Sequence, residues 1–124
     1  MEIPETKVFE REVEKQFEFL VDDFSFSGPV FLSSKEKYSD RVVYSRDDTA
    51  VEVLNAWHPA DYGFEVNYYS DKTVLETAGS NAAAREIIYF RLKEQQDGEM
   101  TFIRDGALTL KGYLVSRETP PTSA

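Results

Sequence analysis

Apolar residues recur at steps of three or four between residues 6 and 24, the first patterned segment of the chain. This spacing places them on one side of a helix. Thr6 can cap the first turn, because a hydroxyl at that position accepts a hydrogen bond from an unpaired backbone N–H. The sequence therefore predicts a helix over residues 6–24 with one apolar stripe, made of Phe9, Val13, Phe17, Leu20 and Phe24.

The next part of the chain has the pattern of β-strands. Residues 51–58 and 64–69 alternate between two faces with a period of two, which is typical of half-buried antiparallel strands. Short turns separate these segments, so we expect a four-stranded meander over residues 28–34, 40–46, 50–58 and 64–71. The helix should pack on the face that carries Val53 and Phe64, and Phe26 and Phe31 should seal the corner.

The C-terminal part is less regular. Residues 82–96 begin with alanines and end before Gly98, and this arrangement predicts a helix. Residues 101–116 fit two structures. The Asp105-Gly106 pair between apolar runs favours a hairpin, whereas Leu108, Leu110 and Leu114, together with Tyr113, suit one side of a helix. We favour a final helix after Asp105, although a short apolar run cannot be assigned from its period alone.

These elements define an expected α+β fold: an N-terminal helix, a four-stranded antiparallel meander sheet, and one or two C-terminal helices packed on one face. A length of 124 residues corresponds to one domain. We expect that domain to cover residues 1–118, followed by a flexible tail at residues 119–124.

Charge changes the picture of what the chain binds. The net charge is −9, and all of the excess negative charge lies within residues 1–79. Such a surface repels nucleic-acid phosphates and anionic lipid, so we expect neither nucleic acid nor membrane as a partner. We expect a protein partner with a basic surface, although solubility alone also explains an acidic chain. Self-association as a homo-oligomer stays open.

The compartment expected from composition is the cytoplasm. The chain has no cysteine, and therefore no disulfide framework. Its first residues lack the basic start and apolar run of a secretory signal, and nowhere do 18 apolar residues run together.

Candidate chemistry is sparse. His58 is the only histidine, and with Asp61 it forms the one pair suited to acid–base work. The pairs Asp22-Asp23 and Asp47-Asp48 lack the spacing of a calcium loop, so we expect no metal and no cofactor. Asp22-Asp23 lies near a helix C-terminus, where the macrodipole disfavours anions. That placement indicates either a site for a cation or an arginine, or only the ordinary preference of Asp for helix ends.

Aromatic and acidic residues crowd the segment at residues 55–69. Tyr62 at a turn and Tyr69 on the outward strand face are the aromatics that we expect to be exposed. With Asp61 and Glu65 they would form an aromatic patch ringed by acid, which suits a partner with basic rim residues. These four residues are the partner-binding site predicted from the sequence.

The stretches FEFLVDDFSFSGP, RVVYSRDDTAVEVLNAW and FEVNYY follow one another within residues 9–69. In this order of elements the chain resembles small uncharacterised bacterial α+β proteins, some of them immunity-like proteins encoded beside toxins. The resemblance implies a binding protein that neutralises a partner. It implies no catalytic residues.

Taken with the missing catalytic motifs, these features predict a non-enzymatic, acidic, immunity-like binding protein. One alternative is a small enzyme or ligand-binding domain with a pocket near His58 and Asp61. Another is an oligomeric scaffold that uses an open sheet face.

Overall fold

The computed structural model describes residues 6–32, 39–58, 61–70, 85–92, 95–96 and 99–118. The expected α+β architecture is confirmed, but the sheet has five strands rather than four. The predicted tail at residues 119–124 lies outside the described residues. The described elements are α1 (Thr6–Gln16), α2 (Phe19–Phe24), β1 (Ser27–Phe31), β2 (Ser39–Arg46), β3 (Thr49–His58), β4 (Asp61–Tyr69), β5 (Arg85–Leu92) and α3 (Thr101–Glu118).

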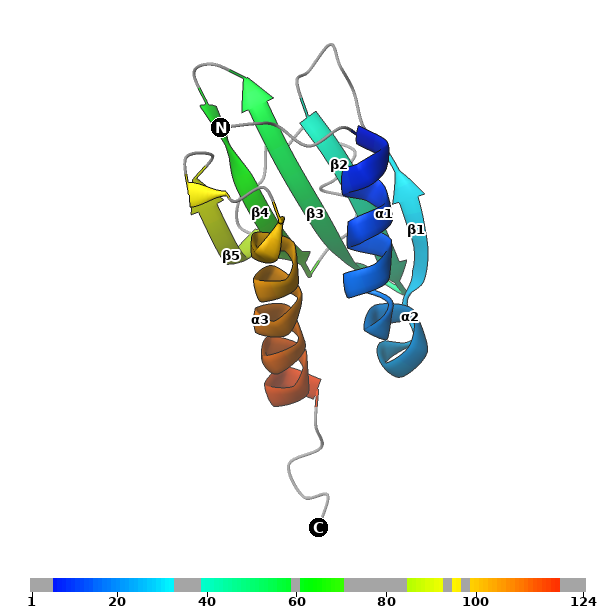
Figure 1. The fold of residues 1–124 in the computed structure, drawn as a ribbon. Helices are drawn as coiled ribbons and strands as arrows, with labels where there is room; N and C mark the ends of the chain where they lie inside the picture. The colour runs from blue at the N-terminus through cyan, green and yellow to red at the C-terminus, as the bar shows by residue number, and fades with distance from the viewer. Residues whose placement is uncertain are drawn as a thin grey trace.

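Each strand of the sheet pairs antiparallel with the strand before it in the chain, in the order β1-β2-β3-β4-β5. All three helices cover the same side of the sheet, as Figure 1 shows. Val53 lies between Val42 and Val66 in the register, and these buried partners point toward the helices. We call this side the helix face. The open face is the other side, on which no described helix lies.

The predicted N-terminal helix is present as two helices. A tight turn at Phe17 and Glu18 separates α1 from α2, with the Leu20 N–H bonded to the Phe17 carbonyl at 3.0 Å. The apolar stripe keeps its spacing across this turn, and Phe9, Val13, Phe17 and Leu20 are fully buried, whereas Phe24 is half-buried. At the start of α1, the Thr6 hydroxyl donates to a carboxylate oxygen of Asp40 on β2 at 2.8 Å.

The corner between α2 and β1 is closed by one of the two expected aromatics. Phe26 is 3% exposed, and the Arg46 guanidinium lies 4.4 Å from the centre of its ring. Arg46 also donates to the carbonyl of Phe24, the last residue of α2, at 2.6 Å. Phe31 is 43% exposed, so the prediction that it seals the corner is wrong.

The predicted helix over residues 82–96 is also wrong, because residues 85–92 form the edge strand β5. Residues 82–84 lie outside the described residues. β5 pairs along β4 from Tyr69 opposite Arg85 to Gly63 opposite Leu92, with one irregularity beside Val66. Most of its apolar residues are β-branched or aromatic, types that fit a pleated sheet. Pairing with β4 decides the structure of this apolar run.

Residues 101–118 form a helix, which resolves the ambiguity of that segment. α3 begins four residues before Asp105, and its buried residues recur at helical spacing: Phe102, Ile103, Ala107, Leu110 and Leu114. Leu108 is 61% exposed and does not belong to this stripe, contrary to expectation. Gly106 brings α3 close to the sheet, since a Cβ there would lie 2.9 Å from side-chain atoms of Phe64 and Val66.

Phe64 on β4 is the centre of the core. Its ring packs edge-on against Phe9 of α1, Tyr89 of β5 and Phe102 of α3, with ring centres 6.3, 6.0 and 5.0 Å away. An element from the start of the chain, α1, therefore meets β5 and α3 at one residue. Edge-on ring pairs add stability beyond the area that they bury.

Candidate functional site

Tyr69, one of the predicted partner-binding residues, is buried. It lies on the open face, as expected from the alternation of β4, but it is only 4% exposed. Its hydroxyl donates to the Oε1 atom of Glu52 at 2.9 Å. The prediction that Tyr69 is an exposed aromatic anchor is therefore wrong. The period-two alternation along a strand predicts which face of the sheet a side chain lies on, but it does not predict which side chains surround it there.

Glu52 organises a polar network on the open face. Its carboxylate accepts hydrogen bonds from Arg41 Nε at 2.7 Å, Asn67 Nδ2 at 3.0 Å and the Tyr69 hydroxyl at 2.9 Å. The donors come from β2 and β4, on either side of β3, so the network ties three strands together. Burial raises the pKa of Tyr69, the charge and hydrogen bond of Glu52 raise it further, and Arg85 acts in the opposite direction. The network is chiefly structural, because the buried carboxylate of Glu52 is already bonded to three donors from the neighbouring strands.

The structure describes the other predicted site residues only in part. Glu65 is half-buried and accepts a hydrogen bond from Asn67 at 3.1 Å. The backbones of His58 and Asp61 are cross-strand partners at the end of the β3–β4 hairpin. The side chains of His58, Asp61 and Tyr62 lie outside the described part of the structure. Neither the pocket expected near His58 nor the aromatic patch can be built from described side chains.

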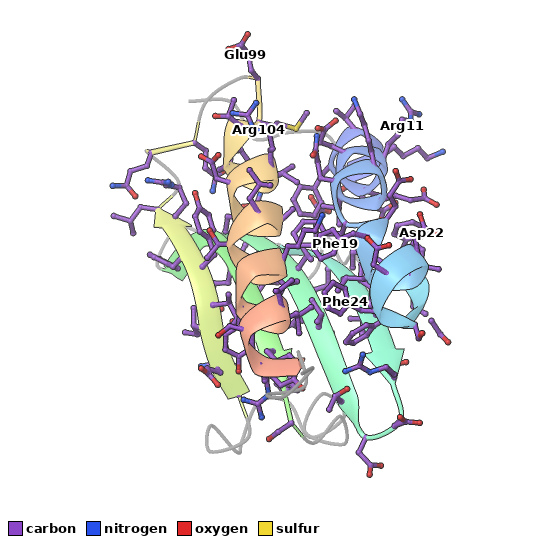
Figure 2. The ribbon with its side chains drawn as sticks, turned by 90° about the horizontal axis from the view of Figure 1, so that it is seen from below. Arg11, Phe19, Asp22, Phe24, Glu99 and Arg104 are labelled. Atoms are coloured by element: carbon purple, nitrogen blue, oxygen red, sulfur yellow. The ribbon has the colours of Figure 1, made fainter. Side chains whose placement is uncertain are left out.

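A different group of acids lies on α1 and α2. Glu10, Glu14, Glu18 and Asp22 follow one another at steps of four residues, and we call this row the acidic stripe. Glu18 keeps helical backbone angles between the two helices, so the row continues across the turn. Figure 2 shows Asp22 on the outer side of α2, whereas Phe19 and Phe24 lie toward α3. The stripe therefore points away from the interface between the helices.

The acidic stripe borders a pocket between the helices and β1. Its volume is about 210 Å³. Three acids of the stripe line it on the helix side, and Tyr44 of β2 lines it from the sheet. The complete lining is Glu14, Glu18, Val21, Asp22, Gly28, Pro29 and Tyr44. We call this the α2–β1 pocket.

Tyr44 is the most unusual member of this lining. It is 1% exposed, and its hydroxyl has no hydrogen-bond partner in the described part of the chain. Burial raises the pKa of Tyr44, and the negative charge of Glu14 raises it further. Buried hydroxyls in proteins are nearly always hydrogen-bonded. A buried donor and acceptor therefore lies at the pocket without a bond.

Gly28 allows β1 to pass close to Tyr44. Its φ is +129°, a backbone conformation that residues other than glycine rarely adopt. A Cβ atom at this position would lie 2.9 Å from the Val43 carbonyl oxygen and 3.2 Å from the Tyr44 ring. A larger residue here would force β1 away from β2. The wall of the pocket thus depends on glycine.

Sequence reasoning found only part of this site. It named Asp22-Asp23 as the mark of a cation or arginine site or of an ordinary helix end, but it did not connect Asp22 with Tyr44. The usable signal was the four-residue spacing of Glu14, Glu18 and Asp22. The contribution of Tyr44 depends on how β1 and β2 pack under α2, which no local pattern contains.

Two further properties are known for the described residues. No group of three histidine, cysteine, aspartate or glutamate side chains among them is arranged to hold a metal ion. None of the described helices is long and apolar enough to cross a membrane. The chain matches no protein-family model, no curated protein and no solved structure.

Proposed function

We propose that this chain is a non-enzymatic binding protein that takes a basic protein partner on the outer face of α1 and α2, in the manner of an immunity-like protein. The acidic stripe is the observation that carries this proposal. Like charges four residues apart destabilise a helix by a few tenths of a kcal/mol per pair. A row of four such acids is therefore unfavourable for the helix itself, and a basic partner would reverse that cost.

The balance of charge along the helices supports the same surface. Lys7, Arg11 and Lys15 offset the acids of α1 in part. Residues 18–24 contain three acids and no base, so the acidic excess is greatest at α2. An acidic face of this kind attracts a basic partner over long distances and mainly raises the association rate.

The test uses charge reversal outside the α2–β1 pocket. Affinity capture from the native host first supplies a partner, whose binding to Glu10→Lys/Asp23→Lys is then measured by surface plasmon resonance at low and physiological salt. We expect association to slow by about tenfold or more and to depend less on salt. The matched control is Glu99→Lys/Asp105→Lys, which makes the same charge change around the start of α3. Equal loss in both variants, or loss in neither, would refute binding through α1 and α2.

One observation favours a second candidate function, an oligomeric scaffold built on the open face. Ile87, Phe90 and Leu92 of β5 are 48%, 47% and 41% exposed, and their β4 partners place them on the open face. No described strand pairs with the outer edge of β5. Exposed apolar side chains on an edge strand favour addition of another strand.

A second copy of the chain fits this edge. If two β5 strands pair antiparallel about Ile88 and Tyr89, Glu86 lies opposite Arg91 and Ile87 opposite Phe90, twice each by symmetry. Both oppositely charged and apolar pairs stabilise antiparallel strands. Light scattering after gel filtration should give a dimer for the wild type and a monomer for Arg91→Glu. A monomeric wild type at high protein concentration excludes the scaffold.

A further inference from the structure

The α2–β1 pocket contains two features that call for the same kind of ligand. On the sheet side, the Tyr44 hydroxyl is buried and unbonded within the described residues. On the helix side, Glu14, Glu18 and Asp22 bring three carboxylates to the rim, and each of these residues is exposed. Carboxylates accept hydrogen bonds and attract positive charge, and a hydroxyl can accept a bond from an N–H group. A cation with several N–H donors would satisfy both sides.

The carboxylates of the pocket rim are not arranged as metal ligands, because no three of the described acids are placed to hold a metal ion. The carboxylates are instead placed to flank a larger, extended cation.

The rest of the lining fits an apolar stem. Val21, Pro29 and the ring of Tyr44 contribute carbon surface to the same pocket. Long cationic side chains bury their methylene groups against such surface and keep the charged head among polar groups. At about 210 Å³, the pocket is smaller than typical sites for drug-sized ligands, which begin near 300 Å³. Its size suits a single side chain.

We propose that the α2–β1 pocket binds the guanidinium group of an arginine side chain supplied by the protein partner. The stem lies against Val21 and Pro29, and the planar head bonds to the carboxylates and to the Tyr44 hydroxyl. Guanidinium presents five N–H donors in one plane and is more weakly hydrated than an ammonium group, so it suits several acceptors spread around a partly buried pocket. This inference deepens the proposed function, and it rests on that function only for the origin of the arginine.

The pocket can be tested without the partner. The probe is N-acetyl-L-arginine amide, added to the full chain during ¹H–¹⁵N NMR titration, and N-acetyl-L-citrulline amide is its neutral counterpart of nearly the same shape. We expect saturable shifts at the backbone amides of Glu18, Asp22, Gly28 and Tyr44 with the arginine probe. Binding of the citrulline probe should be at least tenfold weaker, and the corresponding lysine amide should fall between them.

Two variants separate the roles of the groups. Tyr44→Phe keeps the ring and removes the hydroxyl, so it should weaken the arginine probe about tenfold while the chain stays folded. Glu18→Gln keeps the shape and removes one charge, with the same expected direction. Glu99→Gln, far from the pocket, is the matched control and should bind the probe like the wild type.

Several results would overturn the proposal that the pocket binds arginine. Shifts absent from the pocket, equal binding of arginine and citrulline probes, or unchanged affinity in Tyr44→Phe would overturn the proposal. Equal binding of the lysine probe would overturn the preference for guanidinium. If the arginine probe fails while Glu10→Lys/Asp23→Lys still slows association of the partner, the proposed function stands and only this inference falls. If the arginine probe binds but charge reversal leaves the association of the partner unchanged, the pocket binds arginine and the proposed function falls.

Discussion

Replacing Tyr44 and Tyr69 by phenylalanine should change the stability of this protein in opposite directions. Both tyrosines are buried, at 1% and 4% exposure. The Tyr44 hydroxyl has no bond within the described chain, whereas the Tyr69 hydroxyl donates to the Glu52 carboxylate at 2.9 Å. Phenylalanine keeps the ring in both cases, so the paired substitutions isolate the hydroxyl.

The magnitudes follow from the two environments. A buried polar group without a partner costs about 1–3 kcal/mol, so Tyr44→Phe should raise the free energy of unfolding by about that amount. A hydrogen bond to a charged group contributes about 1.5–3 kcal/mol, so Tyr69→Phe should lower it by a similar amount. Glu52 keeps the donors Arg41 and Asn67 in that variant, which places the loss toward the lower end.

Urea denaturation followed by circular dichroism measures both changes. The slope of the unfolding free energy with urea should stay the same in both variants, because the surface exposed on unfolding hardly changes. If Tyr44→Phe destabilises the protein by about 1 kcal/mol or more, the hydroxyl is hydrogen-bonded in solution and the argument for an unsatisfied pocket fails. If Tyr69→Phe is neutral, the hydrogen bond from Tyr69 to Glu52 contributes little to stability.

Three further predictions concern the core and the pH dependence. Gly106→Ala should destabilise the protein by about 1–2 kcal/mol in urea melts, because overpacking against the sheet outweighs the gain in helix propensity. Gly112→Ala should stabilise it by up to about 1 kcal/mol in the same assay, because a Cβ atom there meets nothing within 4 Å. Phe17→Ala should cost about 3–5 kcal/mol by the same assay, because Phe17 is fully buried. The pKa values of Tyr44 and Tyr69 are raised in the folded chain, so their titration leaves the free energy of unfolding unchanged below about pH 10 and should lower it above that pH by about 1.4 kcal/mol per pH unit for each tyrosine.

The controls differ for each of these predictions. The glycine pair shares one helix and one substitution, so a destabilising Gly112→Ala would discredit the contact argument for Gly106. A loss below about 1 kcal/mol in Phe17→Ala would contradict packing of α1 and α2 on the sheet. The double variant Tyr44→Phe/Tyr69→Phe should lose less stability than the wild type between about pH 10 and pH 11.5, and equal losses would contradict the raised pKa values.

The central strands could be predicted from the sequence because two signals agree there. Residues 51–58 alternate with a period of two, and turn residues flank them, so β3 and most of β4 were located closely. β5 failed because its apolar run, Ile87 to Leu92, fits a buried helix as well as a strand. Only pairing with β4 decides between the two, and that pairing joins residues far apart in the chain. The start of α3 was placed late for a similar reason, since the burial of Phe102 and Ile103 depends on the sheet beneath.

The candidate site was harder to predict than the fold. Strand alternation gave the correct face for Tyr69 but not its bond to Glu52, which comes from a neighbouring strand. The acidic stripe was visible as a spacing in the sequence. Its relation to Tyr44 was not, because that depends on the close pairing of β1 with β2 at Gly28. Sequence patterns report one element at a time, whereas the lining of this pocket comes from four elements: α1, α2, β1 and β2.

The order of the strands has a consequence for how the chain is made. Each strand joins the one synthesised just before it, so the sheet can assemble from its β1 edge while translation continues. Phe64 and Val66 stay partly uncovered until α3, the last of the described elements, packs over them through Gly106. A chain ending at residue 99 should therefore bind a dye specific for exposed apolar surface, and the full chain should not. A chain terminated before α3 would therefore display an apolar surface that chaperones and proteases recognise.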